Sequence, residues 1–179
     1  MIYLFLADGF EEVEALFPLD ILRRAGADVK TVSVTGHEYV TGSHGITVKA
    51  DITDEKFDEN NITAVILPGG MPGTTSLDAS ETVHRALEKA SEDGKIIGAI
   101  CAAPSVLGKA GLLKGKEAIC YPGFEKYLSG AKISDKKVVR DGNIITAAGA
   151  GVAREFGLAL TVALFSPDAA EKIAKAIIS

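Results

Sequence analysis

The stretch from Lys95 to Gly108 constrains the fold more than any other part of the chain. It begins with an apolar run of strand length, turns through the small residues Cys101-Ala-Ala-Pro104 and continues as a helix-compatible sequence. Proline is tolerated in the first helical turn because its missing N–H would have no intrahelical partner there. The pattern therefore places Cys101 at a strand-to-helix corner, where the helix end favours an anion and lowers a thiol pKa. The alternative is an inert core cysteine, since cysteine is often fully buried.

Short apolar runs of strand length alternate with stretches whose apolar residues recur at helical spacing. The predicted strands cover residues 2–7, 29–34, 64–67, 96–100, 117–120, 138–140 and 143–146. This alternation indicates an α/β sandwich, with a mostly parallel sheet and helices on both faces. We expect one domain over residues 1–179, because a chain of this length can bury a single core.

In such a sheet the ligand crevice lies at the carboxyl ends of the strands. Three loops leave predicted strands at that edge, and they cover Asp8 to Glu14, Pro68 to Gly73 and Cys101 to Pro104. The pair Gly69-Gly70 either forms a simple turn or brings a backbone N–H close to a ligand. Together with the N–H of Ala102, that group would form an oxyanion hole.

Three glutamates stand at the start of the first predicted helix. Acidic residues in a first turn stabilise a helix by about 0.3–1 kcal/mol each, and we expect Glu11 and Glu12 to do only this. Glu14 lies nearer the buried face, beside Val13. Burial raises the pKa of a carboxyl, so Glu14 could share a proton with a neighbouring thiol.

Composition excludes several classes of partner. A net charge of −5 argues against nucleic acid, which binds basic surfaces. No apolar stretch approaches the roughly 18 residues of a membrane span, and no basic segment precedes the first apolar run as in a signal peptide. Two cysteines form no disulfide framework and suit a reducing compartment. We therefore expect a cytoplasmic protein that binds neither membrane nor nucleic acid.

Five motifs, in this order along the chain, resemble those of the ThiJ/PfpI superfamily and in particular its DJ-one branch. They are Asp8-Gly-Phe-Glu-Glu-Val-Glu14, Arg23-Arg-Ala-Gly26, Leu67-Pro-Gly-Gly70, Ala99-Ile-Cys-Ala-Ala-Pro104 and Gly149-Ala-Gly151. The resemblance covers essentially the whole chain. It implies a flavodoxin-like α/β sandwich that forms a homodimer and needs neither a cofactor nor a metal.

The resemblance also implies a role for individual residues. Cys101 corresponds to the reactive thiolate and Glu14 to its protonated hydrogen-bond partner. Gly70 and Ala102 correspond to the backbone donors of the oxyanion hole. The residues expected to line the site are Gly69, Arg24, Tyr121 and His44.

Three positions depart from the patterns of the superfamily. Protease-like members carry histidine immediately after the cysteine, where this chain has Ala102, so a Cys-His triad of that type is absent. Tyr121 replaces a histidine of many DJ-one relatives, and tyrosine is a poor base at neutral pH. His44 replaces an arginine near the expected dimer interface, and is either a basic group for the partner's site or a solvated turn residue. Cys120 precedes Tyr121 on a predicted strand and should face away from the site.

Two functions remain open, with a third less favoured. The first is an enzyme acting on methylglyoxal-type dicarbonyls or their early glycation adducts, with Cys101 as nucleophile and Glu14 as proton shuttle. The second is an oxidative-stress sensor or protective protein in which an oxidant converts Cys101 to a sulfinate. A protease or general hydrolase is disfavoured by Ala102.

Overall fold

A computed structural model describes residues 1–179, and its centre is a seven-stranded sheet in the order β10-β11-β7-β6-β1-β2-β5. Neighbouring strands run parallel except for β10, which pairs antiparallel with β11 at one edge. The strands are β1 (Ile2–Leu6), β2 (Val29–Ser33), β5 (Ile52–Thr53), β6 (Ala64–Leu67), β7 (Ile96–Ile100), β10 (Val138–Asp141) and β11 (Ile144–Ala147). The predicted mostly parallel sheet is thus confirmed.

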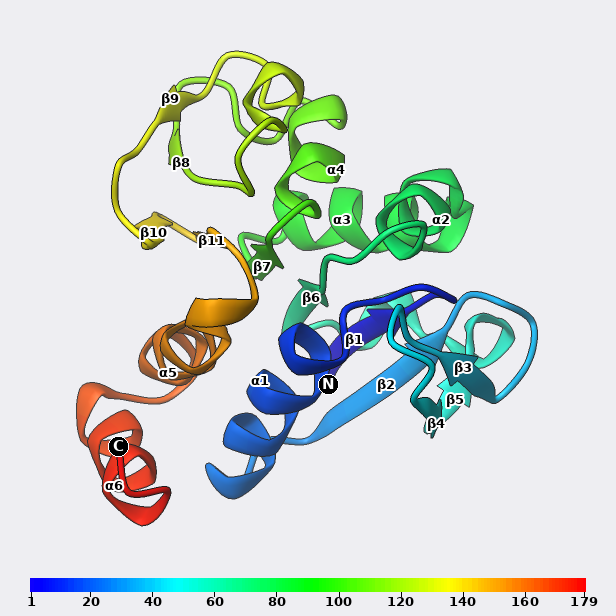
Figure 1. The fold of residues 1–179 in the computed structure, drawn as a ribbon, viewed down its shortest axis with the longest axis horizontal. Coiled ribbons are helices and arrows are strands. Elements are labelled where there is room, and N and C mark those ends of the chain that lie inside the picture. Colours follow the sequence, from blue (N-terminus) through cyan, green and yellow to red (C-terminus); the bar gives the residue numbers. More distant parts are fainter.

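Helices cover both faces of the sheet, as the fold class requires (Figure 1). The helices are α1 (Glu12–Arg24), α2 (Gly73–Ala79), α3 (Glu81–Glu92), α4 (Pro104–Lys109), α5 (Ala153–Leu164) and α6 (Pro167–Ala176). Figure 1 shows α1 and α5 side by side on one face, and α2, α3 and α4 on the other. This arrangement is a flavodoxin-like sandwich.

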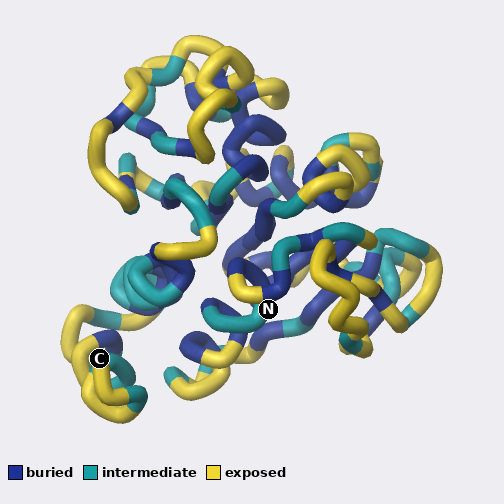
Figure 2. Tube along the Cα trace, viewed as in Figure 1, coloured by how far each residue is buried: buried dark blue, intermediate teal, exposed yellow.

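The alternation of side chains along a strand divides the core in two. In β1, Phe5 belongs to the cluster beneath α3 and α4, whereas Leu4 and Leu6 belong to the cluster beneath α1 and α5. Phe156 and Leu160 of α5 pack into the second cluster. Because both faces of the sheet are covered, its central strands are apolar throughout, and Figure 2 shows them buried.

Smaller elements lie at the periphery. The strands β3 (Tyr39–Thr41) and β4 (Thr47–Lys49) form an antiparallel hairpin, and β8 (Glu117–Ala118) pairs with β9 (Lys132–Ile133). The 3-10 helices η1 (Asp54–Lys56), η2 (Glu59–Asn61), η3 (Glu125–Tyr127) and η4 (Ala150–Val152) complete the chain. No helix is both long enough and apolar enough to cross a bilayer.

The adjacent strands β1, β6 and β7 bring three loops together at their carboxyl ends. The N–H of Glu11 donates to the carbonyl of Gly69 at 2.9 Å, which joins the first loop to the second. The loop after β7 begins at Cys101, whose N–H donates to the carbonyl of Ala147 at 2.8 Å. The loops that border the predicted crevice therefore lie together at this edge of the sheet.

Candidate active site

Cys101 lies at the corner between β7 and α4 in a left-handed backbone conformation, with φ of 65°. Such a conformation is uncommon for a residue with a side chain and costs about 1–3 kcal/mol. Its carbonyl accepts from the N–H of Tyr121 at 2.7 Å, and its own N–H is bonded to β11, so the corner is held on both sides. The strand-to-helix corner that the sequence predicted is thus present, and a strained turn of this kind that presents a nucleophile is the geometry of a nucleophile elbow.

Glu14, in the first turn of α1, faces Cys101 from inside the protein, with no solvent exposure. Its Oε2 accepts from the N–H of Gly69 at 2.9 Å, whereas Oε1 is buried and has no hydrogen-bond partner. A Cβ at position 69 would lie 2.6 Å from both the Cys101 Cβ and the Glu14 Oε2. Glycine is therefore required at position 69 for the thiol and the carboxyl to meet.

Burial changes the protonation of both groups. It raises the pKa of Glu14 to about 7, although the hydrogen bonds with Cys101 and Gly69 act in the opposite direction. Burial and the charge of Glu14 raise the pKa of Cys101 to about 12, against the effect of two backbone N–H groups. Because two anions in contact repel, these values describe a pair that loses one proton near pH 7 and retains the other to about pH 12.

The sequence led us to expect that the helix end lowers the thiol pKa. For a thiol beside an ionised carboxylate, this expectation is wrong. α4 has only 6 residues, so its dipole is small, whereas desolvation and a neighbouring anion act directly on Sγ. The two N–H groups that favour the thiolate belong to Gly70 and Ala102, which are the donors predicted for an oxyanion hole.

A pocket of about 270 Å³ opens over the Cys101–Glu14 pair. Its lining residues are Glu11, Glu14, Gly70, Met71, Cys101, Ala102, Tyr121, Phe124 and Ala150. Ligand pockets in proteins usually measure about 300–1,000 Å³, so this one suits a small molecule. None of the lining residues is a histidine, in keeping with the disfavoured protease-type triad.

The backbone of Gly70 comes close to the first loop. Its φ is +91°, and a Cβ there would lie 2.5 Å from the carbonyl oxygen of Gly9 and 2.6 Å from the carbonyl carbon of Phe10. Only glycine can therefore bring this N–H to the sulfur without moving the loop after β1.

Tyr121 lines the pocket, and its side chain is on the opposite side of the chain from that of Cys120. β8 ends at Ala118, so the predicted strand over residues 117–120 is too long, and both residues lie in the loop that follows. Cys120 is nevertheless 1% exposed and part of the core, whereas Tyr121 is 51% exposed. Cys101 thus lines the pocket, and Cys120 does not.

Glu12 does more than stabilise the helix dipole, which corrects the expectation from the sequence. Its carboxylate is 8% exposed and accepts from the N–H groups of His44 and Ile46 at 2.8 and 3.4 Å. Burial raises the pKa of Glu12, but the hydrogen bonds, chiefly that with His44, outweigh it and the pKa falls to about 2. Glu12 thereby fastens the β3–β4 hairpin to α1.

His44 and Arg24 do not line the pocket of this chain. The Nδ1 of His44 lies 2.9 Å from Glu12 Oε2 and 3.6 Å from Glu11 Oε1, and these carboxylates raise the pKa of the imidazole. Arg24 is at the opposite end of α1 and forms an ion pair with Asp20 at 2.6 Å. Within one chain, the structure therefore brings together Cys101, Glu14 and the glycine loop, without these two residues.

The sequence did not predict Met71, Phe124 or Ala150 at the site, and Glu11, which was expected only to stabilise the helix, also lines the pocket. Met71 follows the Gly69-Gly70 pair directly, so its place in that loop was an available signal. Phe124 and Ala150 reach the pocket from loops remote in sequence, and no local pattern marks them.

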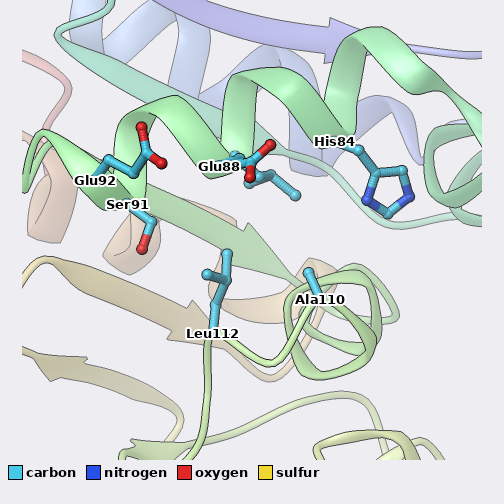
Figure 3. A pocket seen from close by; sticks show the side chains of 7 residues that line it. His84, Glu88, Ser91, Glu92, Ala110 and Leu112 are labelled. Carbon is cyan, nitrogen blue, oxygen red and sulfur yellow. The ribbon is translucent and has the colours of Figure 1, made fainter.

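A larger cavity of about 360 Å³ lies elsewhere, between α3 and the segment after α4. Figure 3 shows His84, Glu88 and Glu92 projecting from α3, with Ala110 and Leu112 on the opposite side. It contains no cysteine, and the imidazole Nε2 of His84 is engaged with the carbonyl of Asp78 at 2.6 Å. The Cys101 pocket is therefore the better candidate for chemistry.

The flavodoxin-like sandwich and the cysteine on a left-handed corner define a class of cysteine-containing α/β proteins, and comparison with known proteins identifies it. The model of the DJ-1/PfpI family matches residues 1–163, and the chain belongs to this family. The chain is 35% identical to the protein dj-1beta of Drosophila melanogaster, over 97% of this chain and 94% of that protein.

Three further relatives extend the comparison. A deglycase of Pyrococcus abyssi is 32% identical, over 78% of this chain and 84% of its own length. The structure described as Toxoplasma gondii DJ-1, oxidized, superposes with a TM-score of 0.94 at 36% identity, covering 99% of this chain and 97% of that one. In the DJ-1 homolog B of Arabidopsis thaliana, which is 38% identical, the match spans 94% of this chain and only 39% of that protein.

Proposed function

We propose that the protein is a cysteine-dependent glyoxalase or deglycase that converts methylglyoxal-type dicarbonyls, or their early glycation adducts, into hydroxy acids. The main support is the buried Glu14 carboxyl, which faces Cys101 and has one oxygen without any partner. The name of the Pyrococcus abyssi relative, a deglycase, is consistent with this substrate class.

In the proposed reaction the sulfur of Cys101 forms a bond to the aldehyde carbon, and the carbonyl oxygen takes the proton of Glu14 to give a hemithioacetal. The N–H groups of Gly70 and Ala102 stabilise the negative charge that develops on that oxygen. The Glu14 carboxylate then removes the proton of the former aldehyde carbon and delivers it to the adjacent carbon, while the hydroxyl proton on the former aldehyde oxygen passes to the oxygen of that adjacent carbon. The product is a thioester, and water hydrolyses it to lactate in the case of methylglyoxal, releasing the sulfur.

The acidity of the thiol alone would not account for the rate at which Cys101 attacks the dicarbonyl. Lowering a thiol pKa from about 8.5 to 5 gains roughly thirtyfold in thiolate at neutral pH, but a Brønsted slope of about 0.4–0.5 removes a similar factor. Most of the rate enhancement must therefore come from the positioning of the reacting groups. Gly69 and Gly70 provide this positioning, because they allow three loops to meet at the sulfur.

A second candidate function is an oxidation sensor. The Toxoplasma gondii relative is described as oxidized, and Cys101 is only partly buried, so a small oxidant can reach its sulfur. In that role a peroxide would oxidise the thiolate to sulfenate and then to sulfinate, being itself reduced to water, and a protonated Glu14 would donate to a sulfinate oxygen.

We further propose that the chain forms a homodimer in the cytoplasm. Val13 of α1 and Ile46 beside β4 are exposed apolar residues near the same end of α1, because Glu12 accepts from the N–H of Ile46. Burying such a patch in a symmetric interface is the commonest solution. The two free cysteines suit a reducing compartment. Light scattering at micromolar concentration tests the dimer, and a monomer would contradict it.

Lactate formation from methylglyoxal tests the enzymatic proposal, with three proteins compared in parallel. We expect Cys101→Ser to lower kcat/KM by at least about 100-fold, because the hydroxyl cannot replace a thiolate nucleophile. Cys120→Ser is the matched control and should retain activity, since its side chain lies in the core away from the pocket. Equal loss in both variants, or none in Cys101→Ser, would contradict the proposed role of Cys101.

A further inference from the structure

Three side chains converge beside the rim of the pocket without belonging to the Cys101–Glu14 pair. Glu11, Glu12 and His44 each offer one ligand atom, and these atoms all lie within 4.8 Å of one another. Nδ1 of His44 is 2.9 Å from Glu12 Oε2 and 3.6 Å from Glu11 Oε1. Ser43 Oγ lies 3.2 Å from Glu11 Oε2 and 3.1 Å from the same Nδ1. The cluster thus joins the start of α1 to the β3–β4 hairpin.

The hairpin is built around the Glu12 carboxylate. Oε1 is held by the backbone N–H groups of His44 and Ile46, which leaves Oε2 directed at the imidazole. A Cβ at Gly42 would overlap the Glu12 side chain, so glycine at that position makes room for it. The orientation of Oε2 is therefore set by the fold, as outer hydrogen bonds orient a metal-binding carboxylate.

We infer that Glu11, Glu12 and His44 bind a divalent transition-metal ion of the zinc type. One imidazole nitrogen with two carboxylates is a mixed donor set that suits zinc and its neighbours, whereas calcium and magnesium prefer oxygen alone. Two carboxylates balance the charge of a divalent ion and outweigh the partial positive charge at the start of α1. His44 binds through Nδ1 in its neutral form, and the proton that now bridges it to Glu12 leaves on binding.

The spacing of the ligand atoms fits this ion. Zinc binds nitrogen and carboxylate oxygen at about 2.0–2.2 Å in a tetrahedron, which separates neighbouring ligand atoms by roughly 3.3–3.6 Å. The distance from Nδ1 to Glu11 Oε1, 3.6 Å, is at the upper edge of this range, and the hydrogen-bonded distance from Nδ1 to Glu12 Oε2, 2.9 Å, must lengthen by about 0.4 Å when a metal replaces the proton. In the single chain the His44 side chain is 67% exposed, so water can reach the cluster and complete the tetrahedron.

Titration of metal-free protein with Zn²⁺, followed by calorimetry, tests the inference. Both thiols must first be removed, so the parent protein is the Cys101→Ser/Cys120→Ser double variant. In that background we expect one Zn²⁺ per chain, and at least tenfold weaker binding after either His44→Ala or Glu11→Gln. His84→Ala is the matched control, because His84 lies on α3 against a different cavity, and it should bind like the parent.

If His44→Ala leaves the zinc binding of the parent unchanged, the metal lies elsewhere. If the thiol-free parent binds no zinc, the cluster is not a zinc site. Co²⁺ offers a second readout, since a bound thiolate gives an intense charge-transfer band that carboxylate and imidazole ligands do not. We expect this band to be absent from the thiol-free parent while its weaker ligand-field bands depend on His44.

Discussion

Glu12 and Glu14 are two residues apart on α1 and are both removed from solvent, yet their carboxyl groups behave in opposite ways. The pKa of Glu12 is lowered to about 2 and that of Glu14 is raised to about 7. Desolvation acts on both in the same direction, upward. Burial alone therefore cannot explain the difference.

The hydrogen-bond donors around each carboxylate explain it. Glu12 accepts from the N–H groups of His44 and Ile46, from the hydroxyl of Ser43 and from an imidazole. Glu14 accepts from the N–H of Gly69 on one oxygen only and faces a thiol that is itself able to ionise. Donors stabilise the charged form, so Glu12 is a fixed anion that holds a hairpin, whereas Glu14 can gain and lose a proton at neutral pH.

The largest predicted effect concerns turnover. Glu14→Gln keeps the shape and a donor but removes the proton carrier, so we expect kcat to fall by about 100-fold or more. The thiol of that variant should still react with iodoacetamide, at Cys101 before Cys120. Glu14→Asp shortens the side chain by one carbon and should impair both turnover and thiol reactivity, because the proton is then misplaced. Wild-type turnover in Glu14→Gln would mean that another group, such as Tyr121, is the base.

The second prediction concerns the pH dependence of stability. The folded Cys101–Glu14 pair loses its first proton at about pH 7, whereas Glu14 in the unfolded chain loses its proton at about pH 4.5, so the native state binds an extra proton between these values. The stability that this proton contributes is complete below about pH 4.5 and is lost as the pH rises through 7, by about 3 kcal/mol. Urea unfolding at several pH values should show this slope in the wild type.

The matched comparison for that slope is Glu14→Gln, in which the side chain cannot ionise. The difference in the free energy of unfolding between the wild type and Glu14→Gln should therefore change with pH between about pH 4.5 and 7. A difference that is independent of pH across this interval would contradict the raised pKa of Glu14.

Glu12 should show the opposite dependence, with a smaller amplitude. Its folded pKa lies below the unfolded value, so its contribution is present above about pH 4.5 and is lost as the pH falls toward 2. The cluster borders solvent through His44, and allowing for screening we expect about 1 kcal/mol. Acid unfolding of Glu12→Gln should lack this component, and an unchanged acid limb would show that the hairpin does not depend on the charge.

The smallest effect is predicted for Gly149→Ala, which alters the surroundings of Glu14 and leaves Glu12 untouched. The added methyl would lie 3.9 Å from Cys101 Sγ, 3.9 Å from Glu14 Oε1 and 3.4 Å from the Tyr121 ring. These are ordinary van der Waals contacts, so stability should change by less than about 0.5 kcal/mol. We expect KM for methylglyoxal to rise a few-fold with little change in kcat, and an unchanged KM would mean that substrate approaches from another side.

Local patterns were sufficient to predict much of the fold and part of the site. The apolar runs predicted the strands, and the small-residue corner predicted where Cys101 lies, because both depend on neighbours in sequence. The role of Glu12 could not be predicted in this way. Its donors come from residues 43–46, and only the folded hairpin brings them to α1.

The thiol pKa was not predictable from the sequence for a similar reason. A helix end next to Cys101 is visible in the sequence, but the depth of burial and the approach of Glu14 depend on how β1, β6 and β7 align. The loop after β8 is a further example. The strand pattern there extends to Cys120, whereas the pairing with β9 ends after two residues, and the chain then turns to join the corner at Cys101.

We expect Cys101 and Glu14 to share one proton at neutral pH, with the charge on sulfur and the proton on the carboxyl. The ultraviolet absorbance of the thiolate, followed against pH in Cys120→Ser to remove the other thiol, tests it most directly. Thiolate absorbance should appear with the first ionisation of the pair, at or below about pH 7. Absorbance that develops only near pH 12 would place the charge on Glu14 and leave a neutral thiol, which would contradict this arrangement of the proton.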